Sequence, residues 1–196
     1  MRDNRNHPKK GSSITVEPIR EIKDIKRIKR NLKDKPRDLL LFTLGINNGL
    51  RIGDLLKLKV QDVKNLQPGD TFTIREQKTK KSNVVMINKE VRRTLAVYLD
   101  AIQPNDEDFL FKSRIGQNQS LNKSYVNSLV KKWTADIKGN YGTHSLRKTF
   151  GYIQRKVFGT SFEVICKRFN HSNPSITMRY LGIEDKEVNG ILLNEI

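Results

Sequence analysis

Apolar residues recur at every third or fourth position through much of the chain, a spacing typical of helices that bury one face. The first such run follows Pro18, which suits a first helical turn, and it ends at Leu32. Pro36 opens a second run, which Gly49 interrupts. The pattern therefore predicts two helices here, and a short third helix in the segment RIGDLLKL that follows.

A different pattern occupies the next segment, where β-branched residues gather. TFTIRE and NVVMI flank the polar turn QKTKKS, and this arrangement predicts an antiparallel hairpin. Helical spacing then returns in residues 89–102, in residues 126–137 and in three later segments. Gly139 suits the end of one of these helices, and Thr143 suits the cap of the next. We expect an α+β fold, mainly α-helical, with one small antiparallel β-hairpin.

Charge is the first indication of function. The 196 residues include 38 Lys and Arg against 21 Asp and Glu, a net charge of +17. So many like charges repel one another and destabilise the folded chain unless a polyanion binds to them. Nucleic acid is the leading candidate, because the neutralisation of its phosphates dominates the affinity of proteins for it. A merely basic surface or an anionic membrane surface are the alternatives that charge alone leaves open.

Composition also bounds the class of protein. A hydrophobic content of 36% with 30% charged residues is typical of a soluble globular domain. No apolar run approaches the roughly 20 residues that a membrane helix needs, and the N-terminus lacks the apolar stretch of a signal peptide. The single cysteine, Cys166, excludes an intramolecular disulfide, so we expect a protein of the cytoplasm.

The chain divides into an arm and one domain. Residues 1–16 are polar, basic and without periodicity, which predicts a flexible N-terminal arm, and residues 17–196 form the expected domain. Residues 182–196 carry a dense apolar set for a chain end. We expect this tail either to pack on another protein molecule or to fold back on its own domain.

Six polar residues stand out along the domain. In order they are Arg51, Lys78, His144, Arg147, His171 and Tyr180. Arg51 lies at a predicted helix start, where a guanidinium beside free backbone N–H groups makes an anion pocket. His144 and Arg147 are three residues apart and therefore share one face of a helix. Each residue taken alone suits an ordinary surface or core position as well.

Together the six residues and their surroundings resemble the tyrosine recombinases, also called the phage integrase family. NNGLRIGDLLKLKVQDV resembles the box around that family's first arginine, and EQKTKKSNVVMI resembles its lysine-bearing hairpin. THSLRKTFG is similar to its His-x-x-Arg box, and NHSNPSITMRYL is similar to its closing box with the nucleophilic tyrosine. The resemblance runs from about Glu17 to Leu181 and implies the fold of a tyrosine recombinase catalytic domain.

Two departures from the family pattern bear on what the resemblance implies. Asn170 stands where the family usually has glycine before the second histidine, and because asparagine accepts a left-handed backbone we expect the change to be tolerated. The helical core-binding domain that commonly precedes the catalytic domain is absent from residues 1–16, so we expect it to be missing or supplied elsewhere. Lys78 shares its turn with Lys80 and Lys81, which makes its assignment the least specific.

The resemblance implies a reaction. Tyr180 attacks a phosphodiester of double-stranded DNA and gives a 3′-phosphotyrosine, without ATP, metal or cofactor. Arg51, Arg147 and His171 stabilise the transition state, and Lys78 protonates the departing 5′-oxygen. His144 accepts the tyrosine proton or orients Arg147. The sequence itself shows too few histidines and cysteines for a metal site and no phosphate-binding loop.

The family's members assemble as four protomers on two DNA sites, and the resemblance implies such self-association in a prokaryotic host. The favoured interpretation is a site-specific recombinase or integrase. A type IB topoisomerase, a resolvase of DNA ends and a DNA-binding accessory protein without activity are the alternatives. A basic RNA-binding module is a further one, although the sequence shows no aromatic RNA-recognition box.

Overall fold

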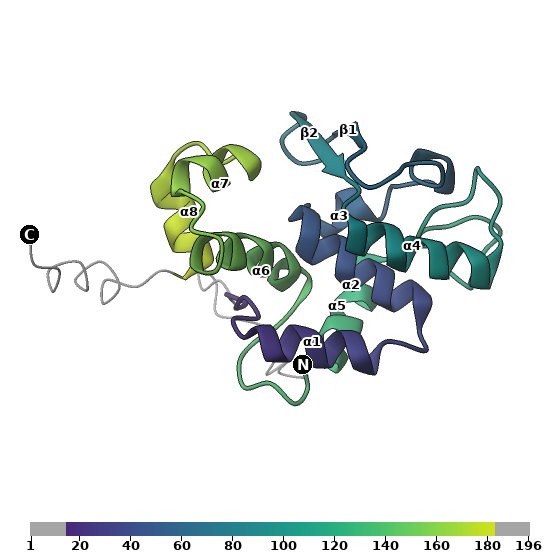
Figure 1. Ribbon diagram of the computed structural model, residues 1–196, viewed down its shortest axis with the longest axis horizontal. Coiled ribbons are helices and arrows are strands. Elements are labelled where there is room, and N and C mark those ends of the chain that lie inside the picture. Colours follow the sequence, from purple (N-terminus) through teal and green to yellow (C-terminus); the bar gives the residue numbers. More distant parts are fainter. Residues whose placement is uncertain (1–14, 183–196) are drawn as a thin grey trace, which may run out of the picture.

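The computed structural model describes residues 15–182 (Figure 1). The tail beyond Gly182 and all but the last two residues of the expected arm lie outside the described residues. In chain order the elements are α1 (Ile22–Asn31), α2 (Pro36–Asn48), α3 (Ile52–Leu55), the 3-10 turn η1 (Val60–Asp62), β1 (Thr71–Arg75), β2 (Ser82–Met86), α4 (Lys89–Ile102), α5 (Lys123–Trp133), α6 (Thr143–Lys156), α7 (Phe162–Arg168) and α8 (Pro174–Leu181). The expected mainly helical α+β fold is confirmed.

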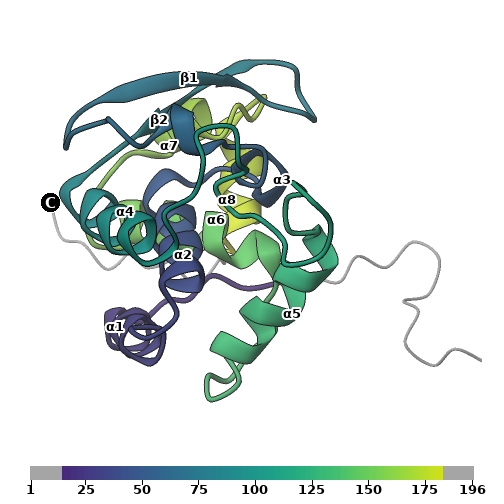
Figure 2. The same cartoon turned by 90° about the vertical axis from the view of Figure 1, so that its right-hand side faces the viewer.

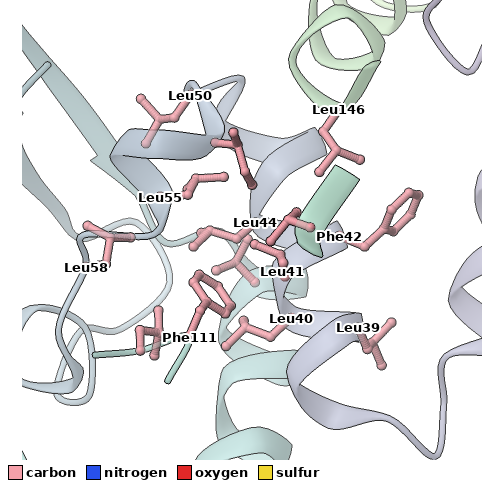
Figure 3. Close-up of a cluster of buried hydrophobic side chains, with 14 of the residues drawn as sticks. Leu39, Leu40, Leu41, Phe42, Leu44, Leu50, Leu55, Leu58, Phe111 and Leu146 are labelled. Atoms are coloured by element: carbon pink, nitrogen blue, oxygen red, sulfur yellow. The ribbon is translucent and has the colours of Figure 1, made fainter. Parts of the chain in front are cut away.

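Helix α2 is the centre of the main hydrophobic core. It packs against α4 and α6, and most of its residues are buried, as a helix that is apolar on nearly all sides requires (Figures 1 and 2). Figure 3 shows its leucines meeting Leu55 and Leu58 from the segment that follows, Phe111 and, on α6, Leu146. The end of α2 is therefore fixed relative to α6, and both elements carry candidate site residues.

A second, smaller cluster joins α6, α7 and α8. Ile165, Phe169 and Leu181 are buried, and Phe150 and Tyr180 pack against them. In Figure 1, α7 and α8 lie together on one side of α6, and the hairpin and α4 lie on the other. This cluster holds the ring of the candidate nucleophile in place.

The hairpin is antiparallel, and Ile74 of β1 pairs with Asn83 of β2. Burial alternates along both strands, so that Phe72 and Ile74 turn inward from β1 and Asn83 and Val85 turn inward from β2. The predicted two-stranded hairpin is confirmed, and the turn that carries Lys78 lies at its tip.

The segment ahead of α1 runs along α6 and the loop before it. The carbonyl of Thr15 accepts a hydrogen bond from the Asn140 side chain, and the Glu17 N–H donates to the Asn140 carbonyl at 2.8 Å. The Ile19 N–H donates to Thr149 Oγ1 at 2.8 Å. The start of the described chain is thus bonded to α6 before it enters its own first helix.

Three predicted helix signals were wrong. Pro18 does not open a helix, because the chain stays extended to Glu21 and α1 begins at Ile22. Gly139 does not end α5, which stops at Trp133 where the Thr134 hydroxyl bonds back to a carbonyl of the last turn. Thr143 is the first residue of α6 and Gly142 is the cap. The Thr143 N–H instead meets the Asn127 side chain, a contact that sequence spacing does not show.

No helix in the described part of the chain combines the length and the apolar character needed to cross a membrane.

Gly49 occupies a position that a side chain cannot. Its φ is +60°, and an added Cβ would lie 2.5 Å from Phe150 Cδ1. We expect Gly49→Ala to lower the free energy of unfolding by about 2–5 kcal/mol, the sum of left-handed backbone strain and overpacking. Gly159 is the matched control, because its φ is +69° with nothing within 4 Å, so Gly159→Ala should cost only about 1–2 kcal/mol. Equal losses in urea unfolding would contradict the packing argument.

Glu90 at the start of α4 gives a second expectation, on pH. Hydrogen bonds from Arg93 and Lys29 lower the pKa of Glu90 from 4.5 to about 2, although burial opposes the shift. The stabilising contribution is therefore complete above pH 4.5 and is lost as the pH falls through 2. Glu90→Gln should lower stability at pH 7 by at most about 1 kcal/mol. In urea unfolding this difference from wild type should shrink at pH 3, whereas the exposed Asp34→Asn control should show no difference at either pH.

Candidate active site

Five separate segments bring the six predicted residues into one neighbourhood. Arg51 follows α2, Lys78 lies in the hairpin turn, and the first two turns of α6 supply His144 and Arg147. His171 follows α7, and Tyr180 lies on α8. The charges of Arg147 and Arg51 lower the pKa of Tyr180. The same two charges, and more weakly that of Lys78, lower the pKa of His144. The order of residues in the sequence thus corresponds to a cluster in space.

Arg147 is the most enclosed member of the cluster, with 2% of its surface exposed. Nη1 donates to the Gly49 carbonyl at 2.6 Å and Nη2 to the Phe169 carbonyl at 2.7 Å. The guanidinium lies 4.2 Å from the centre of the Phe169 ring. Burial lowers the pKa of Arg147 to about 10, which the Tyr180 oxygen partly opposes, so the side chain stays charged at neutral pH.

Arg51 occupies the cap position of α3 with an extended backbone. Its side chain is 18% exposed, and Nη1 donates to Glu76 Oε2 at 2.6 Å. An arginine carries five N–H donors, so one ion pair fixes the guanidinium and leaves donors for an incoming anion.

Tyr180 presents its ring edgewise to two neighbours. The ring centres of Phe169 and His171 lie 5.7 Å and 5.3 Å away, at nearly perpendicular angles. Lys148 Nζ lies 4.9 Å from the Tyr180 ring centre. Burial raises the pKa of the Tyr180 hydroxyl, while Arg147 and Arg51 lower it in part, and one of these contributions is a hydrogen bond with Arg147. At neutral pH the hydroxyl therefore keeps its proton in the free protein.

His144 lies beside that hydroxyl, with Nδ1 3.4 Å from the Tyr180 oxygen. Burial of the ring lowers the pKa of His144, and Arg147 and Arg51 lower it further. The ring is therefore neutral at pH 7 and can accept a proton. Of the two roles that the sequence left open for His144, the geometry favours acceptance of the tyrosine proton over orientation of Arg147.

His171 is held from α8. Its Nδ1 lies 2.9 Å from the hydroxyl oxygen of the buried Thr177. Burial, followed by the charges of Arg147 and Arg51, lowers the pKa of His171 to about 4. Asn170, which precedes it, has a φ of +52°, so the expectation that asparagine takes the left-handed conformation here is confirmed. That backbone turn aims His171 back at Tyr180.

Both chain neighbours of Lys78, Gln77 and Thr79, are hydrogen-bonded. The Gln77 N–H donates to Asp54 Oδ1 at 2.9 Å, and the Gln77 side chain donates to the Gly53 carbonyl. On the far side, the Thr79 hydroxyl donates to Glu76 Oε2. Lys78 itself is exposed at the tip of this turn.

Three residues of the site's framework were missed by the sequence reasoning: Glu76, Asn83 and Arg168. Arg168 Nη1 donates to Asn83 Oδ1 at 2.6 Å, and its Nε donates to the Asn48 carbonyl at 3.1 Å. Asn83 Nδ2 donates in turn to Glu76 Oε1 at 2.8 Å. A signal for Glu76 was available, because it continues the inward alternation of Phe72 and Ile74 and so places a carboxylate where the strand faces the core.

The arrangement combines a proton acceptor, a phenol and two guanidiniums around one oxygen, with an exposed lysine nearby. Such a set can bind a phosphate and transfer it to the phenol. Within residues 15–182, no group of three or more His, Cys, Asp and Glu side chains is placed to hold a metal ion.

The chain is similar to known proteins both in sequence and in fold. The model of the phage integrase family matches residues 19–187. The probable integrase/recombinase YoeC of Bacillus subtilis is 37% identical over 174 residues, which cover 87% of this chain and 91% of YoeC. The chain spans about half the length of other relatives, named tyrosine recombinases, with coverages of 51%, 56% and 43%.

Among solved structures, the XerA recombinase has a TM-score of 0.75 at 22% identity and is matched over 94% of this chain and 68% of its own. A lambda integrase tetramer bound to a Holliday junction has a TM-score of 0.61 at 14% identity, over 86% of this chain and 49% of its own. These likenesses show the fold. The family match and the likeness to YoeC show that the chain belongs to the phage integrase family, the tyrosine recombinases.

Proposed function

We propose that this chain is the catalytic domain of a site-specific recombinase that cuts and rejoins DNA through a phosphotyrosine bond. The observation that carries the proposal is the contact of the Tyr180 hydroxyl with His144 Nδ1 at 3.4 Å, beside two arginines. A phenol, a neutral imidazole and two guanidiniums around one oxygen are what attack on a phosphodiester requires. This supports an active enzyme over an accessory protein without activity.

The first step makes one phosphorus–oxygen bond and breaks another. The Tyr180 oxygen attacks phosphorus, its proton passes to His144, and the bond from phosphorus to the 5′-oxygen breaks. The products are a 3′-phosphotyrosine and a free 5′-hydroxyl. Because one phosphodiester replaces another, rejoining by a 5′-hydroxyl reverses the step without ATP or cofactor.

The cations around Tyr180 act on the transition state. Charge grows on the two non-bridging oxygens, and guanidiniums with fixed positions stabilise it without reorganisation. Arg147 is fixed by the two carbonyls, and Arg51 is fixed by Glu76. His171 supplies a further donor to the same oxygens. The departing 5′-oxygen needs a proton, and exposed Lys78 at the tip of the turn is the proposed acid.

Double-stranded DNA is the proposed substrate, consistent with a net charge of +17. We also propose that copies of the chain assemble on DNA as a tetramer. The solved lambda integrase tetramer on a Holliday junction supports this assembly through its shared fold. We propose that the apolar residues of 182–196, for which the sequence also leaves folding back on their own domain open, contact a neighbouring protomer; this tail lies beyond the described residues.

Tyr180→Phe tests the nucleophile. Wild-type protein is mixed with supercoiled plasmids carrying random inserts, covalent complexes are isolated under denaturing conditions, and the captured inserts define the target site. Wild type should retain DNA on the 3′ side of the break, and the Phe variant should fall to background. DNA affinity in a filter-binding assay should stay within about twofold, because the phenyl ring keeps its contacts with Phe169 and His171. A covalent adduct with the variant would show that another side chain is the nucleophile.

Lys78→Ala tests the general acid on the captured site. Cleavage should slow by about 100-fold or more, as is typical for loss of a general acid. On a substrate whose 5′-bridging oxygen is replaced by sulfur, which departs without a proton, the variant should recover. Arg147→Ala should not recover, because it stabilises different oxygens. Lys80→Ala is the matched control from the same turn. If the 5′-sulfur substrate restored cleavage by Lys80→Ala and not by Lys78→Ala, the general acid would be Lys80.

A further inference from the structure

Glu76 is a fully buried carboxylate, with 0% of its surface exposed. Oε2 accepts from Arg51 Nη1 at 2.6 Å and from the Thr79 hydroxyl, and Oε1 accepts from Asn83 Nδ2 at 2.8 Å. The three donors come from the start of α3, from the hairpin turn and from β2. A buried charge is tolerated only when it is paired and hydrogen-bonded in this way, so Glu76 ties three parts of the site to one point.

The negative charge of Glu76 also affects the pKa values of residues to which it is not hydrogen-bonded. It is among the charges that raise the pKa of Arg147, Arg168 and His171. Burial pushes the pKa of Glu76 itself upward, but the bonds from Thr79, Asn83 and Arg51 prevail and leave it below the ordinary value. Glu76 is therefore ionised at neutral pH and offsets part of the positive charge that the arginines place in the site.

The turn that carries Lys78 is fixed through the same carboxylate. Glu76 and Thr79 bracket Lys78, and the bond between their side chains closes the turn across it. The Glu76 carbonyl also accepts the Lys80 N–H at 3.0 Å. Gln77 is held by Asp54 and Gly53 of α3, the helix that Arg51 caps. The position of the lysine is thus set relative to the position of the arginine.

We propose that Glu76 is a positioning residue that holds the Arg51 guanidinium and the Lys78 turn in one fixed relation. The inference rests on the proposed function, since it assigns Arg51 to the non-bridging oxygens and Lys78 to the departing oxygen. Glu76 touches neither the phosphate nor the nucleophile in this reaction. It acts by keeping the transition-state stabiliser and the acid in place together, so that both reach the same phosphate.

Glu76→Gln is the direct test, on the DNA site captured by wild type. The amide keeps the size of the side chain but replaces one carboxylate oxygen with an NH2 group. That NH2 group then faces a hydrogen-bond donor that the oxygen had accepted from. Single-turnover cleavage should slow by about 10- to 100-fold, the scale of displacing a reacting group by about an ångström. DNA affinity should change by less than about threefold. Glu90→Gln is the matched control, since Glu90 also binds two cations but lies outside the site, and it should cleave at the wild-type rate.

Thr79→Val tests the positioning of the Lys78 turn separately from the positioning of Arg51. Because it keeps the Glu76 carboxylate, it also remains a test if Glu76→Gln fails to fold. It removes the donor from the turn and leaves the Arg51 pair intact. Cleavage should fall several-fold on ordinary DNA and return to the wild-type rate on the 5′-sulfur substrate. Glu76→Gln should regain only part of its rate there, because Arg51 stays displaced.

A double-mutant cycle distinguishes positioning from a general structural role. On the 5′-sulfur substrate, where the acid is not needed, Glu76 acts only through Arg51, so Glu76→Gln should slow the Arg51→Ala enzyme no further on that substrate. Losses that multiply would contradict the proposal, as would a wild-type rate for Thr79→Val on ordinary DNA or faster cleavage by Glu76→Gln. Failure of wild type to capture any DNA would instead overturn the proposed function.

Discussion

Carbonyl groups at helix C-termini hold the two buried arginines Arg147 and Arg168, and the rest of the arrangement depends on that contact. Arg147 donates to the carbonyls of Gly49 and Phe169, which cap α2 and α7, and Arg168 donates to Asn48, the last residue of α2. Helix ends carry unsatisfied carbonyls and partial negative charge, so they satisfy a buried cation without neutralising it. The site therefore keeps most of its positive charge, as binding of the proposed phosphate substrate requires.

That retained charge, together with burial, also sets the protonation of the candidate reacting groups. Burial and the nearby guanidiniums keep both histidines neutral at pH 7, so His144 is ready to take a proton. The same guanidiniums pull the pKa of Tyr180 down against the effect of burial. One electrostatic field thus favours a neutral ring at the proposed base and opposes the effect of burial on the proposed nucleophile. The negative charge of Glu76 offsets part of the repulsion among the guanidiniums of Arg51, Arg147 and Arg168.

Much of this could be predicted from the sequence, because the signals are local. The spacing of apolar residues predicts the helices, and their alternation predicts the hairpin. The order of the motifs along the chain identifies the six polar residues. The helix ends at Pro18 and Thr143 were misjudged because contacts with distant residues decided them. Helix α5 ends before Gly139, where the Thr134 hydroxyl bonds back to a carbonyl of the last turn. The alternation along β1 does mark Glu76 as facing inward, but its partners could not be predicted: its arginine lies 25 residues away, and Arg168 reaches Asn48 across 120 residues. Partners so far apart in sequence leave no periodic trace.

The bonds between the segment 15–19 and α6 have a mechanical consequence. Thr15 and Glu17 are bonded to Asn140, just ahead of α6, and Ile19 is bonded to Thr149 within that helix. Tension applied to the chain ahead of Thr15 is delivered to these bonds before it reaches α1. The helix that receives the load is the one that carries His144 and Arg147. The described start of the chain and the helix that carries two of the candidate site residues are therefore mechanically coupled.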